Sequence, residues 1–469
     1  MINYLNLDIN RRIFEPIEQE FVAKVQDPVT RVIIVGAGFS GIAAANSLQT
    51  CGVEVVVLEG RSQIGGRTRT LPALGASVEA GGAWIHAPIG NPLTDLAKFL
   101  SIEQRRFALS DIFSEMRLAG LHGEVLDTLE RDRVMQLADE IETELTQLAF
   151  KYVPTQNVAE LLELRLRSIT DPSLRAWVRF VVYMGFQADL ACHAEDISIA
   201  NYALDAGFSG EDNCIVGGYG KMLSRLADGL EIYCDALVSE VQQTTEGVTV
   251  RCTDGRVERG SHVVISVPLG VLKAGCIRFS PELPVAKKRA IEQLGFGAFE
   301  KLILQFEQAF WKIGNASPSG VFIRDHPVFP YWIDVTSTAG RPTLVAHIAG
   351  PPALALANFS PDAALAMALA ALATAFACEV PKPTAVHQTN WSGDPCSRGA
   401  YTHLSPVSTI EDLRSLSEPV GRVLFAGEAT SMQRFGYVDG AYISGLREAQ
   451  RLVSAPRGQL SAINYDPQG

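Results

Sequence analysis

The stretch that decides the fold is RVIIVGAGFSGIAAANSLQTCGVEVVVLEGRSQIGGR, which runs from Arg31 to Arg67. Residues 32–35 form a short β-branched run, with the composition of a strand that is buried on both faces. A G-x-G-x-x-G pattern over residues 36–41 follows directly, and then comes an Ala-rich segment that predicts a helix. The stretch therefore predicts a strand, a glycine-rich turn and a helix, in that order.

The three glycines of this turn, Gly36, Gly38 and Gly41, indicate that a phosphate-bearing ligand binds there. One glycine makes the tight turn, one lets the backbone approach a pyrophosphate, and one lets the helix pack on the strand. The phosphates are expected at the N-terminus of the helix, where free N–H groups point outward. A second apolar run, residues 53–58, ends in Glu59, near the ~20-residue offset at which a carboxylate binds ribose hydroxyls. Because an acid there disfavours a 2′-phosphate, the pattern predicts binding of a dinucleotide that lacks one.

Arginines just beyond Glu59 narrow the choice of dinucleotide. Arg61 and the run Gly65-Gly66-Arg67 place two guanidinium groups where they can neutralise a diphosphate. Residues 59–67 read E-x-R-x-x-x-G-G-R, which resembles the FAD signature of the flavin-containing amine oxidase family. The resemblance implies FAD as the cofactor.

The length and charge of the chain limit its class and partners. Its 469 residues are too many for one compact core and predict two or three domains. A net charge of −12 disfavours nucleic acid and anionic membranes as partners. The same charge either favours a cationic substrate or serves solubility alone, and the sequence leaves both explanations open.

Three further features concern the compartment of the protein. The eight cysteines have no C-x-x-C spacing and no Cys/His cluster, which favours reduced core residues over disulfides or zinc. The N-terminal arm, residues 1–28, contains Arg11-Arg12 with no apolar stretch behind it, so we expect no export signal and a cytoplasmic protein. The uncharged, mostly alanine run of residues 363–378 is shorter than the ~18 residues of a membrane span, so no membrane is expected as a partner. This run predicts a buried or half-buried helix with Ser360 as its cap and with Leu365, Leu369, Leu372 and Phe376 on one face.

Later segments resemble the same family, in the same order along the chain. The run VEAGGAWIH, residues 78–86, resembles the segment that passes beside the flavin ring, with Ala83 and Trp84 near the ring and His86 beginning the substrate pocket. Val238 matches a valine whose backbone meets the adenine. Lys301 begins an apolar strand, where a buried lysine is costly without a partner. In the family the matching lysine reaches a water on the flavin N5 atom, whereas an exposed strand-end lysine is the plain alternative.

The last segments complete the resemblance. Trp391 would pack near the flavin, and Tyr401 and Tyr437 would form two walls of an aromatic slot that suits an amine. Members with a covalently bound flavin carry cysteine where this chain has Ala400, so the resemblance implies non-covalent FAD. The expected catalytic residues are Lys301, Tyr401, Tyr437 and His86, and no metal is expected. The expected cofactor-binding residues are Gly36, Gly38, Ser40, Gly41, Glu59, Arg61, Gly66, Arg67, Ala83, Trp84, Val238, Trp391, Glu428 and Val438.

The resemblance covers residues 31–453 and implies an α/β (α+β) fold. It predicts a Rossmann-type FAD-binding domain, made by residues 29–105, 212–275 and 388–455. That domain would be interleaved with a mixed-sheet and helical substrate domain, residues 106–211 and 276–387, and followed by a C-terminal tail, residues 456–469.

The function that follows from the resemblance is oxidation of a primary or secondary amine, with the polyamine oxidases as the closest members. A neutral amine would give a hydride to the flavin, leaving an imine that hydrolyses to an aldehyde, and molecular oxygen would be reduced to hydrogen peroxide. Acids that could hold the distal ammonium of a polyamine are Asp205, Glu211 and Asp212, although solvated loop acids are the plainer reading. The sequence sets no oligomeric state.

Three alternatives stay open at this point. A biosynthetic oxidase that acts on a larger amine-bearing metabolite would keep every motif. An L-amino-acid oxidase would need an arginine near residues 84–91 for the substrate carboxylate, and none is there. A non-enzymatic module, as in chromatin-associated relatives, would be expected to carry a long inserted helical hairpin and an extra N-terminal domain, which we do not recognise in this sequence.

Overall fold

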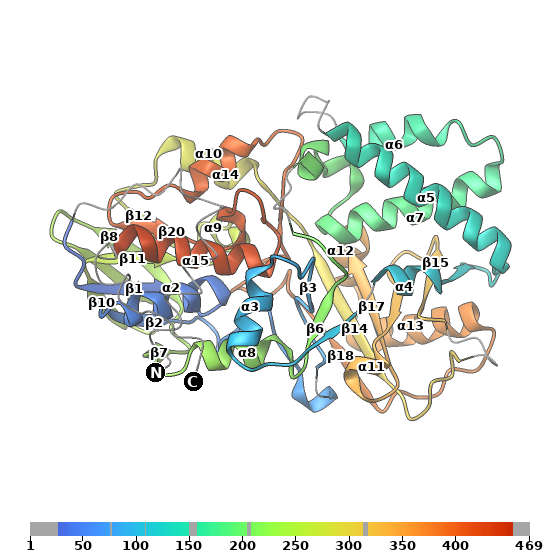
Figure 1. Cartoon of the computed structure of the whole chain (residues 1–469), viewed down its shortest axis with the longest axis horizontal. Coiled ribbons are helices and arrows are strands. Elements are labelled where there is room, and N and C mark those ends of the chain that lie inside the picture. The colour runs from blue at the N-terminus through green and yellow to red at the C-terminus, as the bar shows by residue number, and fades with distance from the viewer. Residues whose placement is uncertain are drawn as a thin grey trace, which may run out of the picture.

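The computed structural model describes residues 27–75, 77–107, 109–149, 157–203, 208–312 and 318–453. Most of the expected N-terminal arm and all of the expected C-terminal tail lie outside these ranges. Figure 1 shows two parts with a large sheet each, with α2 and α15 at one end of the molecule and α5, α6 and α7 at the other.

A five-stranded parallel sheet carries the glycine-rich turn. Its order is β20-β11-β1-β2-β7, so strands from distant parts of the chain lie side by side. Val32 and Ile34 pack against the helices on one face, while Ile33 and Val35 pack against a smaller sheet on the other. This explains why the β1 sequence is apolar at successive positions rather than alternating. The elements are β1 (Arg31–Val35), β2 (Glu54–Leu58), β7 (Ile232–Tyr233), β11 (His262–Ile265), β20 (Val423–Phe425), α2 (Phe39–Thr50) and α15 (Val438–Leu452).

The smaller sheet has four strands in the order β10-β9-β8-β12. Its strands are antiparallel except for the β8–β12 pair, which is parallel. Helices α9 and α10 flank β12 in the chain, and α14 packs against α10. The elements are β8 (Val238–Gln243), β9 (Val248–Cys252), β10 (Val257–Gly260), β12 (Arg278–Ser280), α9 (Leu269–Lys273), α10 (Val285–Gln293) and α14 (Ile410–Ser417).

The second large sheet has six strands in the order β18-β14-β17-β16-β15-β5. Side chains alternate between its two faces: Ile303 and Val345 meet α5, α6 and α7, whereas Leu302 and Ala346 meet α13. The strands are β5 (Arg117–Gly120), β14 (Phe299–Gln305), β15 (Gly320–Arg324), β16 (Tyr331–Asp334), β17 (Thr343–Ala349) and β18 (Ala385–Gln388). The helices are α5 (Thr128–Ala149), α6 (Val158–Leu166), α7 (Pro172–Leu190) and α13 (Pro361–Phe376).

Shorter elements connect these layers. Among them, β3 pairs with β6, and β6 pairs with β4, which holds the segment around Trp84 beside the five-stranded sheet. They are β3 (Trp84–Ile85), β4 (Gln104–Arg106), β6 (Asn213–Ile215), β13 (Gly295–Phe296), β19 (Thr402–His403), α3 (Pro92–Phe99), α4 (Leu109–Ser114), α8 (Gly218–Leu226), α11 (Thr336–Ala339) and α12 (Pro351–Leu356), with 3-10 turns at Pro72–Leu74, Ala194–Asp196, Ile199–Ala203 and Glu428–Thr430.

The α/β fold expected from the sequence is confirmed. Helix α13 forms with Ser360 as its cap, and the expected apolar face is buried at Leu372 and Phe376 and half-buried at Leu365 and Leu369. Alanines such as Ala364 and Ala368 fill the rest of the contact with the sheet. The expectation that the cysteines lie in the core is wrong for two of them. Cys51 and Cys276 are exposed rather than in the core, and all eight cysteines are free thiols.

The predicted domain boundaries stay a prediction. Each strand of the five-stranded sheet falls in a segment assigned to the FAD-binding domain. In the part of the chain that the structure describes, every helix is too short or too polar to cross a bilayer.

Candidate active site

A cavity of about 490 Å³ is lined by the ends of β1 and β2 and by β14 of the six-stranded sheet. Every expected site residue lines it except Gly41. A Cβ atom on Gly41 would lie 1.9 Å from the Gly36 carbonyl oxygen, so this glycine lets α2 pack against the turn. The structure therefore brings the expected residues together around one cavity, and their chemical roles stay predictions.

One end of the cavity is the glycine-rich turn. Gly36 has φ of +105°, which a residue with a side chain adopts only with strain. A Cβ atom on Gly38 would have its nearest neighbour 4.0 Å away, the Cα of Gly66, so backbone is bare at this point of the cavity. The buried Glu59 carboxylate accepts hydrogen bonds from the N–H groups of Ala37 (2.8 Å) and Arg61 (2.9 Å), which fixes it beside the turn.

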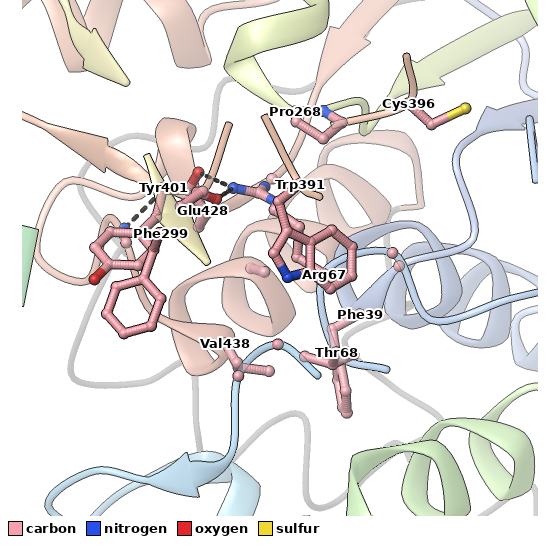
Figure 2. A pocket seen from close by; sticks show the side chains of 18 of the residues that line it. Phe39, Arg67, Thr68, Pro268, Phe299, Trp391, Cys396, Tyr401, Glu428 and Val438 are labelled. Atoms are coloured by element: carbon pink, nitrogen blue, oxygen red, sulfur yellow. Dashed lines mark hydrogen bonds and ion pairs between the residues drawn. The ribbon is translucent and has the colours of Figure 1, made fainter. Parts of the chain in front are cut away.

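Two arginines line the cavity beyond Glu59. Arg61 forms an ion pair with Asp394 at 2.9 Å, while its Nη2 atom is buried and has no partner among the described residues. Arg67 donates to the carbonyl of Ala400 (2.5 Å) and to the carboxylate of Glu428 (2.9 Å). Figure 2 shows Arg67 beside Trp391 and Glu428, with Tyr401 and Phe299 to one side. Burial without a partner is costly for the Arg61 donor, so a bound acceptor is expected there.

These features fit the cofactor that the sequence implies. The bare backbone at Gly38 leaves room for a pyrophosphate, the N-terminus of α2 carries no acidic side chain in its first turn, and Arg61 offers a free donor. Glu59 lies where a ribose would follow the pyrophosphate.

A buried carboxylate that the sequence reasoning missed, Glu300, holds the wall at Trp391. It accepts hydrogen bonds from the Thr389 hydroxyl (2.6 Å) and from the N–H groups of Trp391 and Ser392 (2.9 Å each). The indole of Trp391 in turn donates to the carbonyl of Ala80 at 3.1 Å. Glu300 could have been noticed as an acid next to Lys301 in an apolar strand.

Lys301 is buried in β14, with 6% of its surface exposed, so the alternative of an exposed strand-end lysine is wrong. Its ammonium donates to the carbonyls of Gly81 (2.7 Å) and Glu79 (3.2 Å). Burial lowers the pKa of Lys301 to about 8, although the Glu79 carboxylate opposes that shift. Burial also raises the pKa of Glu79 to about 7, against hydrogen bonds from Tyr219 and Thr70. A lysine has three N–H donors, so one is left to face the cavity.

Aromatic rings surround the part of the cavity next to Lys301. The Tyr401 ring lies 6.1 Å from that of Phe299, and its hydroxyl donates to the carbonyl of Ala188 on α7 at 2.6 Å. Tyr437 meets His86 edge-to-face at 5.5 Å. His86 itself is held by Asp212, with 2.9 Å between Nδ1 and Oδ2. These fixed rings leave an apolar slot with few hydrogen-bonding groups.

Of the acids considered for a distal ammonium, Asp212 differs from the plainer expectation of a solvated loop acid and Glu211 agrees with it. Only 13% of the Asp212 side chain is exposed and His86 occupies it, so it is not a solvated loop acid. Glu211 is exposed, and Asp205 lies outside the described residues.

Two further residues of the cavity were missed. His347 pairs with Lys301 across β14 and β17, and its ring contacts Trp84, Phe299 and Tyr331. Burial and the charge of Lys301 lower the pKa of His347 well below its usual value, so the ring is neutral. Asp189 near the end of α7 also lines the cavity. Neither lies in a motif, since α7 and β17 reach the site only through tertiary packing.

Comparisons with known proteins identify the family of this chain. The profile of the family described as "Flavin containing amine oxidoreductase" matches residues 39–453. Polyamine oxidase 4 of Oryza sativa subsp. japonica is 31% identical over 440 residues, which cover 89% of this chain and 87% of the relative. Lysine-specific histone demethylase 1 homolog 1 of the same rice is 32% identical over 466 residues, 93% of this chain and 54% of the relative, so the chain spans about half the length of that protein. The structure of cyclohexylamine oxidase from Brevibacterium oxydans superimposes with a TM-score of 0.74 at 23% identity, covering 90% of this chain and 98% of that one.

Most residues that line the cavity, from Phe39 to Ala441, fall within the matched range. The chain therefore belongs to the flavin-containing amine oxidoreductase family and is an enzyme of that family.

Proposed function

We propose that this enzyme oxidises an aliphatic amine with non-covalently bound FAD and molecular oxygen, and that its preferred substrates are polyamines. The observation that supports the proposal most strongly is a buried Lys301 that shares one cavity with an aromatic slot and with a bare-backbone turn. Similarity to polyamine oxidase 4 of rice supports the choice of substrate class.

The cofactor would be held by the residues at the turn end of the cavity. Glu59 would bind the ribose, the backbone at Gly38 and the Arg61 guanidinium would bind the diphosphate, and Glu428 and Val438 would border the flavin side. Ala400 provides no thiol for attachment beside Tyr401, and Figure 2 places Cys396 on the other side of Arg67 and Trp391. We therefore expect a dissociable flavin.

The chain's own contribution is to position the amine and to set the charges around it. The flavin, when bound, supplies the two-electron chemistry: a hydride acceptor for the α-carbon of the amine and a reductant of oxygen to hydrogen peroxide. Tyr401, Tyr437 and Phe299 hold the substrate against an apolar wall and exclude water. The free N–H of Lys301 donates into the cavity and stabilises negative charge that forms on oxygen. The amine must be neutral to release hydride, so kcat/KM rises as pH approaches the pKa of the substrate amine.

A second candidate substrate is an N-methylated lysine side chain, because histone demethylase homologues match this chain as well as polyamine oxidases do. Both candidate substrates would lose a hydride from a carbon bonded to the amine nitrogen, and they differ in the groups attached around that nitrogen.

A peroxide assay with a panel of amines tests the proposal. The panel contains putrescine, spermidine, butylamine, an L-amino acid and an N-methyl-lysyl peptide, each at equal concentration with the holoenzyme. We expect the di- and triamine to give the highest kcat/KM. Turnover of the peptide alone would favour the second candidate, and peroxide from the amino acid alone would refute both.

A further inference from the structure

The end of α7 brings a carboxylate into the cavity with nothing to balance its charge. Asp189 is the penultimate residue of the helix, directly after Ala188, whose carbonyl accepts the Tyr401 hydroxyl. Asp189 lies deep in the molecule, yet its side chain is exposed, because the surface it offers faces the cavity. Among the described residues, none donates a hydrogen bond to this carboxylate or forms an ion pair with it.

The position of Asp189 is electrostatically unfavourable in the protein alone. The C-terminal end of a helix carries partial negative charge, which stabilises cations and destabilises anions. Burial raises the pKa of Asp189 to about 6, since the nearby His86 only partly offsets the cost and Asp212 adds to it. An acid without a cation at this end of a helix lowers stability, so its presence needs a reason outside the fold.

A second carboxylate, that of Glu142 on α5, lies beside Gly185 of α7, one helical turn before Asp189. A Cβ atom on Gly185 would sit 2.4 Å from Oε1 of Glu142, so this glycine makes room for the carboxylate against α7. Residues 185 and 189 are four apart on α7, which separates their side-chain positions by ~5–6 Å. No described residue gives the Glu142 carboxylate a hydrogen bond or a cation. Burial and the charges of Asp189 and Asp139 raise the pKa of Glu142 to about 8.

A third unsatisfied group lies near these two acids. The Tyr202 hydroxyl is buried and has no hydrogen-bond partner among the described residues. Besides burial, Asp189 and Glu142 are the largest causes of its raised pKa, which places all three groups in one neighbourhood. Asp189 faces the cavity, Glu142 is half-buried behind it, and the Tyr202 hydroxyl is buried. Oxygen groups without partners beside a substrate cavity are typical of a site that a ligand completes.

We propose that Asp189 and Glu142 form a cation subsite that binds the second ammonium group of an aliphatic di- or polyamine. The reacting nitrogen would lie between Tyr401 and Tyr437, and the alkyl chain would run along the apolar slot toward α7. This inference rests on the proposed amine oxidation and names the residues that select its substrate. Asp212 is not one of these residues, because its carboxylate already contacts the His86 ring.

The test compares a diamine with a monoamine on holoenzyme variants. Putrescine and pentylamine are similar in length and differ in the second ammonium. We expect the ratio of kcat/KM for putrescine to that for pentylamine to fall ~10- to 100-fold in Asp189→Asn and by a smaller factor in Glu142→Gln, as loss of one charged contact implies. The control is Glu140→Gln, an exposed acid of the same helix, which should leave the ratio unchanged. An equal loss for both amines, or no loss for either, would overturn the subsite.

Binding and stability give readouts that do not depend on turnover. Calorimetry under anaerobic conditions should show that putrescine binds the oxidised holoenzyme at least ~10-fold more weakly in Asp189→Asn. Without ligand, the same variant should melt at a higher temperature than wild type, because it removes an unbalanced charge, whereas loss of a structural carboxylate would lower the melting temperature. Equal affinities, or binding of Ca²⁺ in place of putrescine, would overturn the subsite. If putrescine binds through Asp189 but no amine is oxidised, the subsite stands and the proposed function fails.

Discussion

The substitution Lys301→Met removes one charge from the centre of the cavity and keeps most of the side-chain volume. In the structure, two of the three ammonium N–H groups are used by the carbonyls of Gly81 and Glu79, at 2.7 and 3.2 Å, which leaves one for the cavity. One charge-assisted hydrogen bond contributes ~1.5–3 kcal/mol, which corresponds to a factor of roughly 10 to 150 in rate. We therefore expect reoxidation of the reduced flavin by oxygen to slow by that factor.

A second buried lysine provides the matched control. Lys287 is 2% exposed and donates to the carbonyls of Leu416 (2.7 Å) and Ser415 (2.9 Å), but it does not line the cavity. Lys287→Met removes the same charge and the same kind of contacts, so any loss of stability should resemble that of Lys301→Met. Stopped-flow mixing of the reduced enzyme with oxygen measures reoxidation directly. If Lys301→Met and Lys287→Met reoxidised at the wild-type rate, or slowed equally, the cavity role of Lys301 would be refuted.

Three further predictions concern the cofactor and pH. Gly41→Ala should lower the free energy of unfolding by about 2–3 kcal/mol in chemical denaturation, because its Cβ would meet the Gly36 carbonyl. Gly38→Ala should fold and retain at least ~10-fold less flavin after gel filtration. Equal flavin retention by Gly38→Ala and wild type would contradict the proposed diphosphate site at the glycine-rich turn. Acid precipitation should release yellow flavin into the supernatant, since Ala400 offers no thiol, and colour that stays in the pellet would show a covalent bond. Burial lowers the pKa of Lys301 to about 8, so its charged form is lost as pH rises through that value; reoxidation should slow above pH ~8 in wild type and stay flat in Lys301→Met. The folded pKa lies below the unfolded one, so this lysine's contribution to stability increases between pH ~8 and ~10, which urea unfolding at the two pH values can measure.

The parts of the site that lie in local sequence patterns could be predicted. The strand, turn and helix of residues 31–50 form as expected, and Glu59 stands beside the turn, because each depends on the spacing of neighbouring residues. Lys301 could be singled out because a lysine at the start of an apolar strand needs a reason. Each of these signals lies within one continuous stretch of roughly 30 residues or fewer.

The parts that depend on packing between distant segments could not be predicted. Charged and apolar residues interleave in region 101–208 in a way that favours helices, but the region also contains β4 and β5. Strand β5 forms because it pairs with β15, some 200 residues later in the chain. Asp189 and Glu142 look like ordinary polar positions of two amphipathic helices, and only the approach of α5 and α7 turns them into neighbours without a cation. Glu300 likewise acts through the distant segment at Trp391.

The most direct test of the amine oxidase assignment is anaerobic mixing of the oxidised holoenzyme with putrescine or spermidine, followed by the flavin absorbance. The account predicts that the yellow colour bleaches in a single turnover, faster as pH approaches the pKa of the amine, and that it returns when oxygen is admitted, with one hydrogen peroxide per flavin. An oxidised spectrum that persists with every amine of the panel would contradict the account.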